Sequence, residues 1–148
     1  MASREARFWQ AEADGYVLCT LCAQYCRIKP ARPGVCGVRR NVDGRLETEV
    51  YGALAALNVD PIEKKPLFHV LPGSRTLSLA TIGCNFRCTF CQNWDLSQAG
   101  KSARGDRPEH GSAPGEVVEM ARDQDCRVIA YTYSEPTIFY EWAYDIAR

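Results

Sequence analysis

The pattern of apolar and polar positions divides the chain into two unlike halves. In the first half, residues 16–18 predict a short strand, and the segments 35–39 and 46–50 flank a glycine-containing turn at 41–44. Two such segments around a turn of this kind predict a β-hairpin. The stretch 52–73 begins with small residues of ambiguous type and is then interrupted by three prolines, which exclude a continuous helix.

The second half shows strand and helix patterns in alternation. Residues 76–82 predict a strand, and Ser112 is placed to cap a helix over 114–123 that begins with proline. Residues 127–133 predict another strand, and residues 137–148 predict a helix with its large apolar side chains on one face. The order strand, helix, strand, helix is typical of a parallel sheet with crossover helices.

These patterns predict an α/β protein in two parts with a boundary near residue 70. Residues 1–69 would form a small cysteine-rich, metal-binding module with the hairpin and the connector. Residues 70–148 would form the first two strand–helix units of a larger core. Two parallel strands cannot by themselves build a covered sheet, and no glycine or proline ends the last helix. We therefore expect the chain to be the front portion of a longer protein.

Composition and charge exclude several classes of protein. Of 148 residues, 46% are hydrophobic and 24% are charged, as in soluble globular domains. The 18 basic residues balance the 18 acidic ones, so no overall field attracts nucleic acid or an acidic membrane. The longest apolar run, residues 53–57, is far too short to span a bilayer, and the charged N-terminus lacks the apolar core of a signal peptide. A cytoplasmic location is expected.

Eight cysteines set this composition apart, and seven of them fall into two groups. The first group is Cys19, Cys22, Cys26 and Cys36, and the second is Cys84, Cys88 and Cys91. Without an export signal, thiols stay reduced, and clustered cysteines favour metal binding over disulfides. The remaining cysteine, Cys126, directly precedes an apolar run and is interpreted as a small core residue.

The second group is spaced so that one loop can direct three thiolates at one face of an iron–sulfur cluster. Four cysteine ligands saturate a 4Fe–4S cluster, whereas three leave one iron with an open position for a small molecule. The nearest remaining cysteine, Cys126, lies beyond a predicted helix. We therefore predict that Cys84, Cys88 and Cys91 hold a 4Fe–4S cluster with an open iron.

A strand precedes Cys84, and an aromatic residue, Phe90, precedes Cys91. With this spacing, the loop resembles that of the radical S-adenosylmethionine (radical SAM) superfamily. The resemblance implies an incomplete (β/α) barrel in which the open iron binds the amino and carboxylate groups of S-adenosyl-L-methionine. It also implies reductive cleavage of that cofactor to a 5′-deoxyadenosyl radical that abstracts hydrogen from a substrate. A low-potential electron donor, flavodoxin or ferredoxin, would supply the electron.

The same resemblance assigns two cofactor-binding residues. Phe90 would lie beside the adenine of S-adenosyl-L-methionine. Glu135 would approach its amino group, because residues 133–136 stand where the superfamily often has Gly-Gly-Glu-Pro. Tyr133 and Ser134 replace the two glycines, so this sequence departs from the pattern at the point of closest backbone approach.

A closer resemblance extends from about Cys19 to the end of the chain. It rests on the segments 60–69, 72–74, 83–85, 91–94 and 131–137. These are similar to the radical SAM member of the AmmeMemoRadiSam system, a group similar to pyruvate formate-lyase activating enzymes. By that analogy the substrate is a protein or peptide partner, as for glycyl-radical activases, but the resemblance does not name it.

The first cysteine group offers four soft ligands within eighteen residues. A structural zinc site and an auxiliary iron–sulfur cluster use the same four thiolates, and both alternatives stay open. Basic residues follow the cysteines, with no acidic residue between Cys19 and Arg40, and would offset the negative charge of either centre. This basic stretch could also contact nucleic acid, which the balanced overall charge makes the weaker interpretation.

Two other classes of function remain as alternatives. The chain could be a non-catalytic module in which both cysteine groups bind structural zinc, or it could be a simple iron–sulfur electron carrier. Metal analysis separates the first from the enzyme, because two zinc ions give no colour whereas an iron–sulfur cluster is brown. A spectroscopic response to S-adenosyl-L-methionine separates the second, because a saturated cluster has no open iron.

Overall fold

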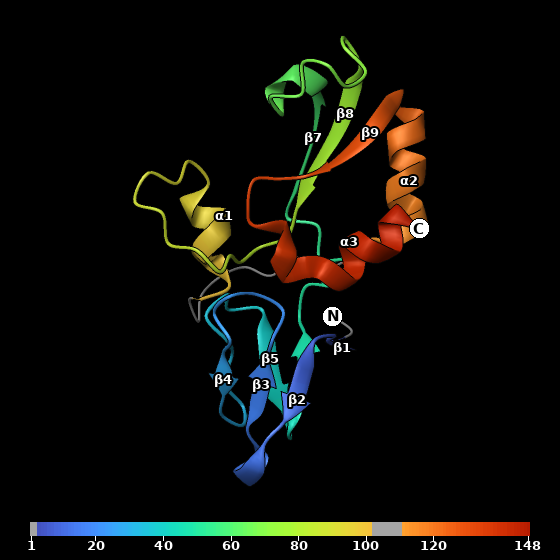
Figure 1. Cartoon of the computed structure of the whole chain (residues 1–148). Helices are drawn as coiled ribbons and strands as arrows, with labels where there is room; N and C mark the ends of the chain where they lie inside the picture. The colour runs from blue at the N-terminus through green and yellow to red at the C-terminus, as the bar shows by residue number, and fades with distance from the viewer. Residues whose placement is uncertain (1–2, 102–110) are drawn as a thin grey trace.

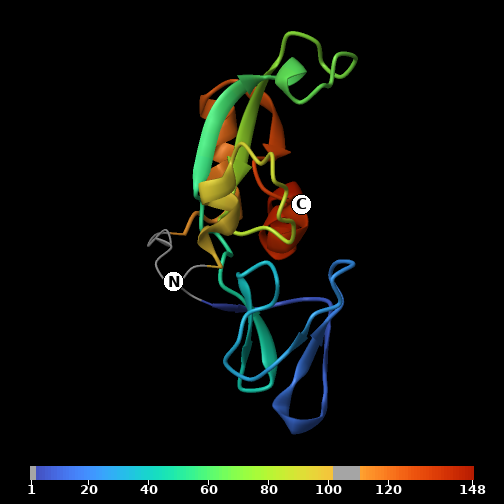
Figure 2. The same cartoon turned by 90° about the vertical axis from the view of Figure 1, so that its left-hand side faces the viewer.

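A computed structural model describes residues 3–101 and 111–148 of the chain. Figure 1 shows a lower part made of short strands and an upper part in which a sheet is accompanied by helices. The turned view in Figure 2 shows the same two parts, one above the other. The mixed α/β composition predicted from the sequence is confirmed.

The lower part contains two small antiparallel sheets, with the strand orders β1-β6-β5 and β2-β3-β4. A 3₁₀ helix, η1, joins β2 to β3. The bounds are β1 Arg4–Glu5, β2 Trp9–Ala11, η1 Ala13–Gly15, β3 Val17–Cys19, β4 Arg27–Ile28, β5 Arg39–Val42 and β6 Arg45–Thr48.

The predicted hairpin is confirmed as β5 and β6. Its two-residue turn, Asp43 and Gly44, has φ values of +50° and +82°, as type I′ hairpin turns require. The first arm begins at Arg39 and not at residue 35, because turns around Cys36 occupy the preceding positions.

The upper part contains one sheet with the order β7-β8-β9. β8 (Arg75–Ala80) and β9 (Cys126–Tyr131) run parallel, which confirms the predicted crossover. β7 (Ala56–Pro61) pairs antiparallel with β8 and was not predicted from the sequence. The 3₁₀ helix η2 (Ile62–Lys64) follows β7 directly.

Strand β7 corrects the boundary predicted near residue 70. It precedes that boundary, yet it belongs to the same sheet as β8 and β9, so the upper part begins at Ala56. The boundary was predicted too late in the chain because the prolines of the connector suggested a segment without regular structure. Pro61 ends β7 on a sheet edge, which is where a strand tolerates a residue without an N–H donor.

The helix predicted after Ser112 is α2 (Pro114–Asp123), but its N-cap is Ala113. The Glu116 carboxylate accepts a hydrogen bond of 2.8 Å from the Ala113 N–H, so the turn is closed by a side chain that reaches back to the cap. The Glu116 side chain at N3 therefore takes the capping role that was predicted for Ser112.

The last predicted helix has two segments, the 3₁₀ helix η3 (Pro136–Phe139) and α3 (Tyr140–Ala147). A further helix, α1 (Trp94–Ala99), follows the second cysteine group and was not predicted. Figure 1 shows α2 beside β9 and α3 between the sheet and the lower part.

Apolar side chains from both parts form one continuous core. Cys36 and Val38 of the lower part belong to the same buried cluster as Leu77 and Leu79 of β8 and Trp142 of α3. A smaller cluster lies within the lower part and consists of Ala6, Val17, Cys19, Ile28 and Leu46. The cysteine-rich part is therefore packed directly against the elements that carry the second cysteine group.

A buried ion pair joins the two parts. Arg39 of β5 donates from Nη1 to both carboxylate oxygens of Glu141 in α3, at 2.9 and 3.0 Å, and the two side chains are 2% and 3% exposed. The Arg7 N–H also donates to Glu141, at 2.6 Å, and the Arg7 carbonyl accepts from Arg39 Nη2. These contacts fix how α3 sits on the lower part.

Candidate functional site

The second cysteine group lies in a loop (residues 84–91, called the cysteine loop below) that follows β8. Cys84 is buried, Cys91 is half-buried and Cys88 is exposed. Gly83 leads into this loop with φ +92°, a conformation that side chains rarely adopt. A Cβ at Gly83 would lie 2.6 Å from Val38 Cγ1 and 2.9 Å from the Cys36 carbonyl oxygen, so the loop starts in contact with the first cysteine group.

Hydrogen bonds to main-chain carbonyls hold the cysteine loop. Gln24 Nε2 donates to the Asn85 carbonyl at 3.1 Å, which ties the loop to the lower part. Gln98 Nε2 and Lys101 Nζ donate to the Phe86 carbonyl at 3.3 and 3.1 Å, which ties it to the end of α1. The loop is therefore anchored on two sides.

A main-chain N–H of the loop and a hydroxyl group of α1 contact two of the thiols. The Phe86 N–H donates to Cys84 Sγ at 3.4 Å, and Cys91 Sγ lies 3.6 Å from Ser97 Oγ. A turn closed by the Cys91 N–H on the Cys88 carbonyl, at 3.2 Å, brings these two cysteines to neighbouring positions.

The two cysteine groups lie close to one another. Burial lowers the pKa of Lys101, and the charge of Arg87 lowers it further. Cys84 and Cys36 act on the same lysine in the opposite sense, so one residue of each group lies within electrostatic reach of Lys101.

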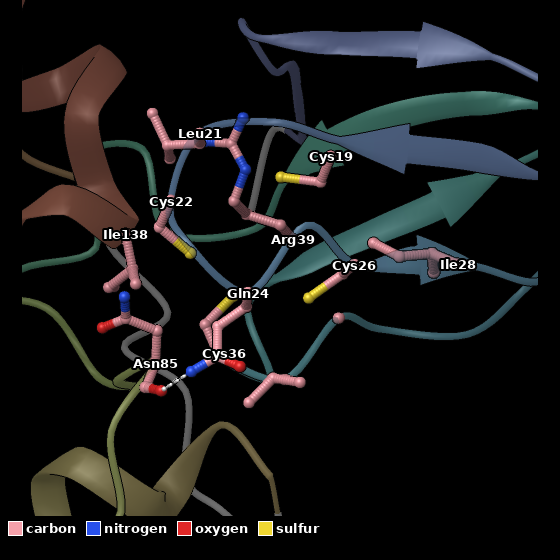
Figure 3. Close-up of a pocket in the computed structure, with 12 residues that line it drawn as sticks. Cys19, Leu21, Cys22, Gln24, Cys26, Ile28, Cys36, Arg39, Asn85 and Ile138 are labelled. Atoms are coloured by element: carbon pink, nitrogen blue, oxygen red, sulfur yellow. Dashed lines mark hydrogen bonds between the residues drawn. The ribbon is translucent and has the colours of Figure 1, made fainter.

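The four cysteines of the first group line one small cavity together with Gln24, Arg39, Asn85 and Ile138. Figure 3 shows Cys22 and Cys26 on opposite sides of this hollow with their sulfur atoms directed inward. The cavity is small, with a volume of about 20 Å³. All eight cysteines are free thiols.

Two buried polar atoms of these lining residues have no hydrogen-bond partner within residues 3–101 and 111–148: Nε of Arg39, which is 2% exposed, and Oδ1 of Asn85, which is 7% exposed. Burial raises the pKa of Cys26 and of Cys36, and backbone N–H groups at Val35 and Val38 act against this rise. Buried orphan groups and thiol-directed N–H donors suit a charged centre in the cavity.

No group of three or more His, Cys, Asp or Glu side chains is arranged to hold a metal ion within residues 3–101 and 111–148. The thiols of the first group therefore line a common cavity without converging on one point. The donor set still fits the predicted centres, because every member is a free thiol and a Cys sulfur moves by rotation about χ1 alone.

Glu135 caps η3, which follows β9. Its Oε1 accepts from the Thr137 N–H at 3.3 Å and from the Thr137 hydroxyl at 2.5 Å. No partner of Oε2 is found among the residues described, and the side chain is half-buried. The carboxylate therefore keeps acceptor capacity for a further donor.

Tyr133 takes the backbone conformation that a glycine would supply. Its φ of +63° lies in the left-handed region, which glycine adopts most readily, so Tyr133 can follow the same kind of turn. Asn93 Nδ2 donates to the Tyr133 carbonyl at 3.1 Å, and the Ser134 hydroxyl donates to the Thr81 carbonyl at 3.2 Å. These bonds join the end of β9 to the end of β8 and to the segment after Cys91.

Phe90, the predicted adenine neighbour, is 85% exposed, and Phe86 in the same loop is 51% exposed. Cys126, the predicted core residue, is buried and belongs to the main core cluster. Thus the three cysteines and Phe90 share one loop, and Glu135 stands at the same edge of the sheet.

Asp60 is a buried carboxylate whose importance was not predicted. Its oxygens accept from Lys64, Lys65 and Ser78, each at 2.8 Å, and from the Tyr133 hydroxyl at 3.1 Å. Burial raises the pKa of Asp60, but these donors outweigh it and hold the pKa well below its usual range. The alternation of polar and apolar residues in 57–60 would have signalled a strand with Asp60 on one face.

Part of the chain matches the sequence model of a known protein family. Residues 78–148 match the sequence model described as the Radical SAM superfamily. This match covers just under half of the chain. It begins within β8 and contains the cysteine loop, Glu135 and α3.

One relative of the whole chain is Uncharacterized protein MJ0808 of Methanocaldococcus jannaschii, which is 45% identical over 142 residues. The match covers 96% of this chain but 42% of that protein, so the chain spans less than half the length of this relative. The name of this relative assigns no reaction, and no solved structure gives a significant match.

Within residues 3–101 and 111–148, no helix is both long and apolar enough to cross a bilayer.

Proposed function

We propose that the protein carrying this chain is a radical SAM enzyme in which Cys84, Cys88 and Cys91 hold a 4Fe–4S cluster with one open iron. When bound, the cluster supplies the electron that breaks a sulfonium C–S bond of S-adenosyl-L-methionine and yields a 5′-deoxyadenosyl radical. The observation that carries this proposal is the position of the three-cysteine loop. It directly follows β8, inside the region that matches the superfamily.

The chain's own residues would bind and orient the cofactors. The buried Cys84 fixes one corner of the loop, while the more exposed Cys88 and Cys91 leave access from solvent. The unused oxygen of Glu135 would accept from the ammonium group of S-adenosyl-L-methionine, and such charge-assisted bonds are strong. Phe90 would cover the adenine, which explains an aromatic ring that is otherwise almost fully exposed.

Tyr133 and Asn93 would act as positioning residues. Their hydrogen bond joins the segment after Cys91 to the turn that carries Glu135. The relative position of cluster and cofactor therefore depends on contacts that this chain supplies.

The finer features of this proposal rest on the family resemblance of the sequence. They are an incomplete (β/α) barrel, a cytoplasmic oxidoreductase, an electron donor such as flavodoxin or ferredoxin, and a protein or peptide substrate as for glycyl-radical activases. The first cysteine group is proposed as a second metal site. None of these features depends on nucleic acid or on a membrane.

The test uses the protein reconstituted with iron and sulfide without oxygen. After addition of dithionite and S-adenosyl-L-methionine, we expect 5′-deoxyadenosine and methionine to form, measured by liquid chromatography. Cys88→Ala should abolish this product, because it removes a cluster ligand. Since Cys88 is exposed, the substitution removes little packing. Cys126→Ser is the matched control, since that thiol lies outside the loop and its Sγ contacts the Gln124 carbonyl.

The alternatives give different outcomes. A colourless protein with two zinc ions would contradict the proposal and support the non-catalytic module. A reducible cluster whose electron paramagnetic resonance spectrum ignores S-adenosyl-L-methionine would support the electron carrier. Full product formation by Cys88→Ala would remove that ligand from the proposal.

A further inference from the structure

We propose that the four-cysteine pocket binds a single Zn²⁺ ion and that Asn85 couples this ion to the cysteine loop. In this view, zinc in the lower part sets the geometry of the segment that follows β8. The evidence for the zinc site does not depend on the function proposed for the cysteine loop. The consequence for cofactor binding rests on the function proposed for the cysteine loop.

The size of the cavity favours one ion over a cluster. Its volume of about 20 Å³ is only slightly more than the roughly 10–15 Å³ needed to hold one water molecule. A 4Fe–4S cluster adds four irons and four sulfides to the same thiols and would require the surrounding turns to separate. Such a separation would break close packing in the cavity wall, where a Cβ at Gly34 would lie 3.1 Å from Ile28 Cδ1 and 3.6 Å from Cys26 Sγ.

The ligand set is the one that closed zinc sites use. Four thiolates complete a tetrahedral shell and leave no open position, as in structural zinc sites. Cys19 and Cys36 are buried, and Cys22 and Cys26 are half-buried, so water has little access to the centre. Rotation of the thiols about χ1 would bring the sulfurs onto one ion without movement of the strands.

Orphan polar groups around the cavity suit the negative charge of such a centre. Four thiolates with one divalent ion carry a charge of about −2. Arg39 Nε is a buried donor without a partner in the described structure, and it belongs to a residue that lines the cavity. The Asn85 carboxamide can turn its NH₂ group to the place of the unpartnered Oδ1, which changes an orphan acceptor into a donor.

Asn85 connects the two cysteine groups through a single residue. Its side chain lines the four-cysteine cavity, while its main chain joins Cys84 to Phe86 in the cysteine loop. Gln24, which also lines the cavity, holds the Asn85 carbonyl at 3.1 Å, as the dashed line in Figure 3 shows. Any change in the cavity is therefore transmitted directly to the position of Cys84.

Another wall of the cavity is formed by η3, the helix that Glu135 caps. Ile138 of η3 lines the cavity and is 1% exposed, and it lies three residues after Glu135. The zinc site thus contacts both segments to which the proposed cofactor contacts belong. Outer-shell partners of this kind change metal affinity or activity by about 10–100-fold when they are replaced.

The first experiment counts metal in the full protein with Cys84, Cys88 and Cys91 all replaced by serine, so that only the pocket can bind. We expect about one zinc and no iron per chain by mass spectrometry of metals. Adding Cys26→Ser should remove the zinc, and adding Cys126→Ser should not. Four irons with sulfide, or no bound metal, would overturn the zinc site.

Zinc-edge X-ray absorption on the unsubstituted protein provides a measurement that does not depend on folding of the triple variant. Four sulfur neighbours at about 2.3 Å are expected. Nitrogen or oxygen neighbours in place of sulfur would overturn the assignment.

The second experiment tests the coupling by hydrogen exchange in a peptide that spans the cysteine loop. With the triple serine variant, removal of zinc by a chelator should speed exchange of this peptide about tenfold. Asn85→Ala should keep one zinc but lose this difference, and the same change at exposed Asn58 should preserve it. Exchange that ignores zinc, or a difference that survives Asn85→Ala, would overturn the coupling. Neither measurement requires cleavage of S-adenosyl-L-methionine, so this proposal and the proposed function can fail separately.

Discussion

Asp60 shows how one buried carboxylate organises residues that are far apart in the sequence. It joins the end of β7 to Ser78 of β8 and to Tyr133 after β9. The Tyr133 contact matters most, because that residue has a strained positive φ and carries the turn before Glu135. The hydrogen bond to Asp60 helps to keep Tyr133 in this conformation.

We expect Asp60→Asn to lower the free energy of unfolding by about 2–3 kcal/mol, because hydrogen bonds to a charged group contribute about that much. The amide keeps the size of the side chain but leaves two lysine ammonium groups without their counter-charge. Urea denaturation of the variant measures the change. Asp123→Asn, at an exposed position on α2, is the control and should cost less than about 0.5 kcal/mol.

The same residue predicts a pH dependence. Because the pKa of Asp60 is lowered in the folded state, its contribution to stability is fully present above its unfolded pKa of about 4. It is lost progressively as the pH falls from there toward the folded pKa. The unfolding free energy of Asp60→Asn should therefore decline less steeply below about pH 4 than that of the parent protein. Parallel acid limbs for the two proteins would contradict this assignment.

At the scale of elements, regular patterns predicted the structure well and irregular ones did not. The hairpin, β8, β9 and the last helix follow from local alternation, helical spacing and turn residues, so they could be read from neighbouring positions. The strand β7 was missed because it ends at Pro61 and two more prolines follow in the connector. The edge position that lets a strand tolerate proline is a property of the sheet and not of the local sequence. The helix α1 was missed because only six residues form it.

The approach of the cysteine loop to the lower part depends on one glycine. We expect Gly83→Ala to lower the free energy of unfolding by about 2–3 kcal/mol, because the new methyl group meets Val38 and the Cys36 carbonyl at a positive φ. Gly44→Ala is a matched control. Its φ of +82° is similar, but a Cβ there meets nothing within 4 Å.

The control should cost about 1 kcal/mol, which is the strain of the left-handed backbone alone. Thermal or urea unfolding of both variants gives the comparison. Equal losses at Gly83 and Gly44 would show that close packing between the two parts has no energetic weight at this position.

At the scale of the whole molecule, the candidate site is assembled from contacts that no local pattern contains. Cys84, Cys88 and Cys91 are neighbours in the sequence, so their grouping could be predicted directly. Asn85 lines the four-cysteine cavity only because the lower part packs against β8, and Arg39 pairs with a carboxylate 102 residues away in the sequence. Two separate modules were expected from the sequence, whereas a shared core and a buried ion pair hold the parts together.

The buried pair Arg39–Glu141 gives the sharpest test of this arrangement. Arg39→Met should lower the free energy of unfolding by about 3–5 kcal/mol, because it leaves the buried Glu141 carboxylate without a counter-charge, with the Arg7 N–H as its remaining donor. Adding Glu141→Leu should restore much of the loss, since two apolar side chains of similar volume replace a pair that is costly to desolvate. The exposed pair Arg45–Glu5 is the control, and Arg45→Met should change stability by less than about 1 kcal/mol. A double-mutant cycle from urea denaturation decides the matter. If the losses at Arg39 and Glu141 simply add, the two charges do not interact, and the lower part must be held on α3 by apolar packing alone.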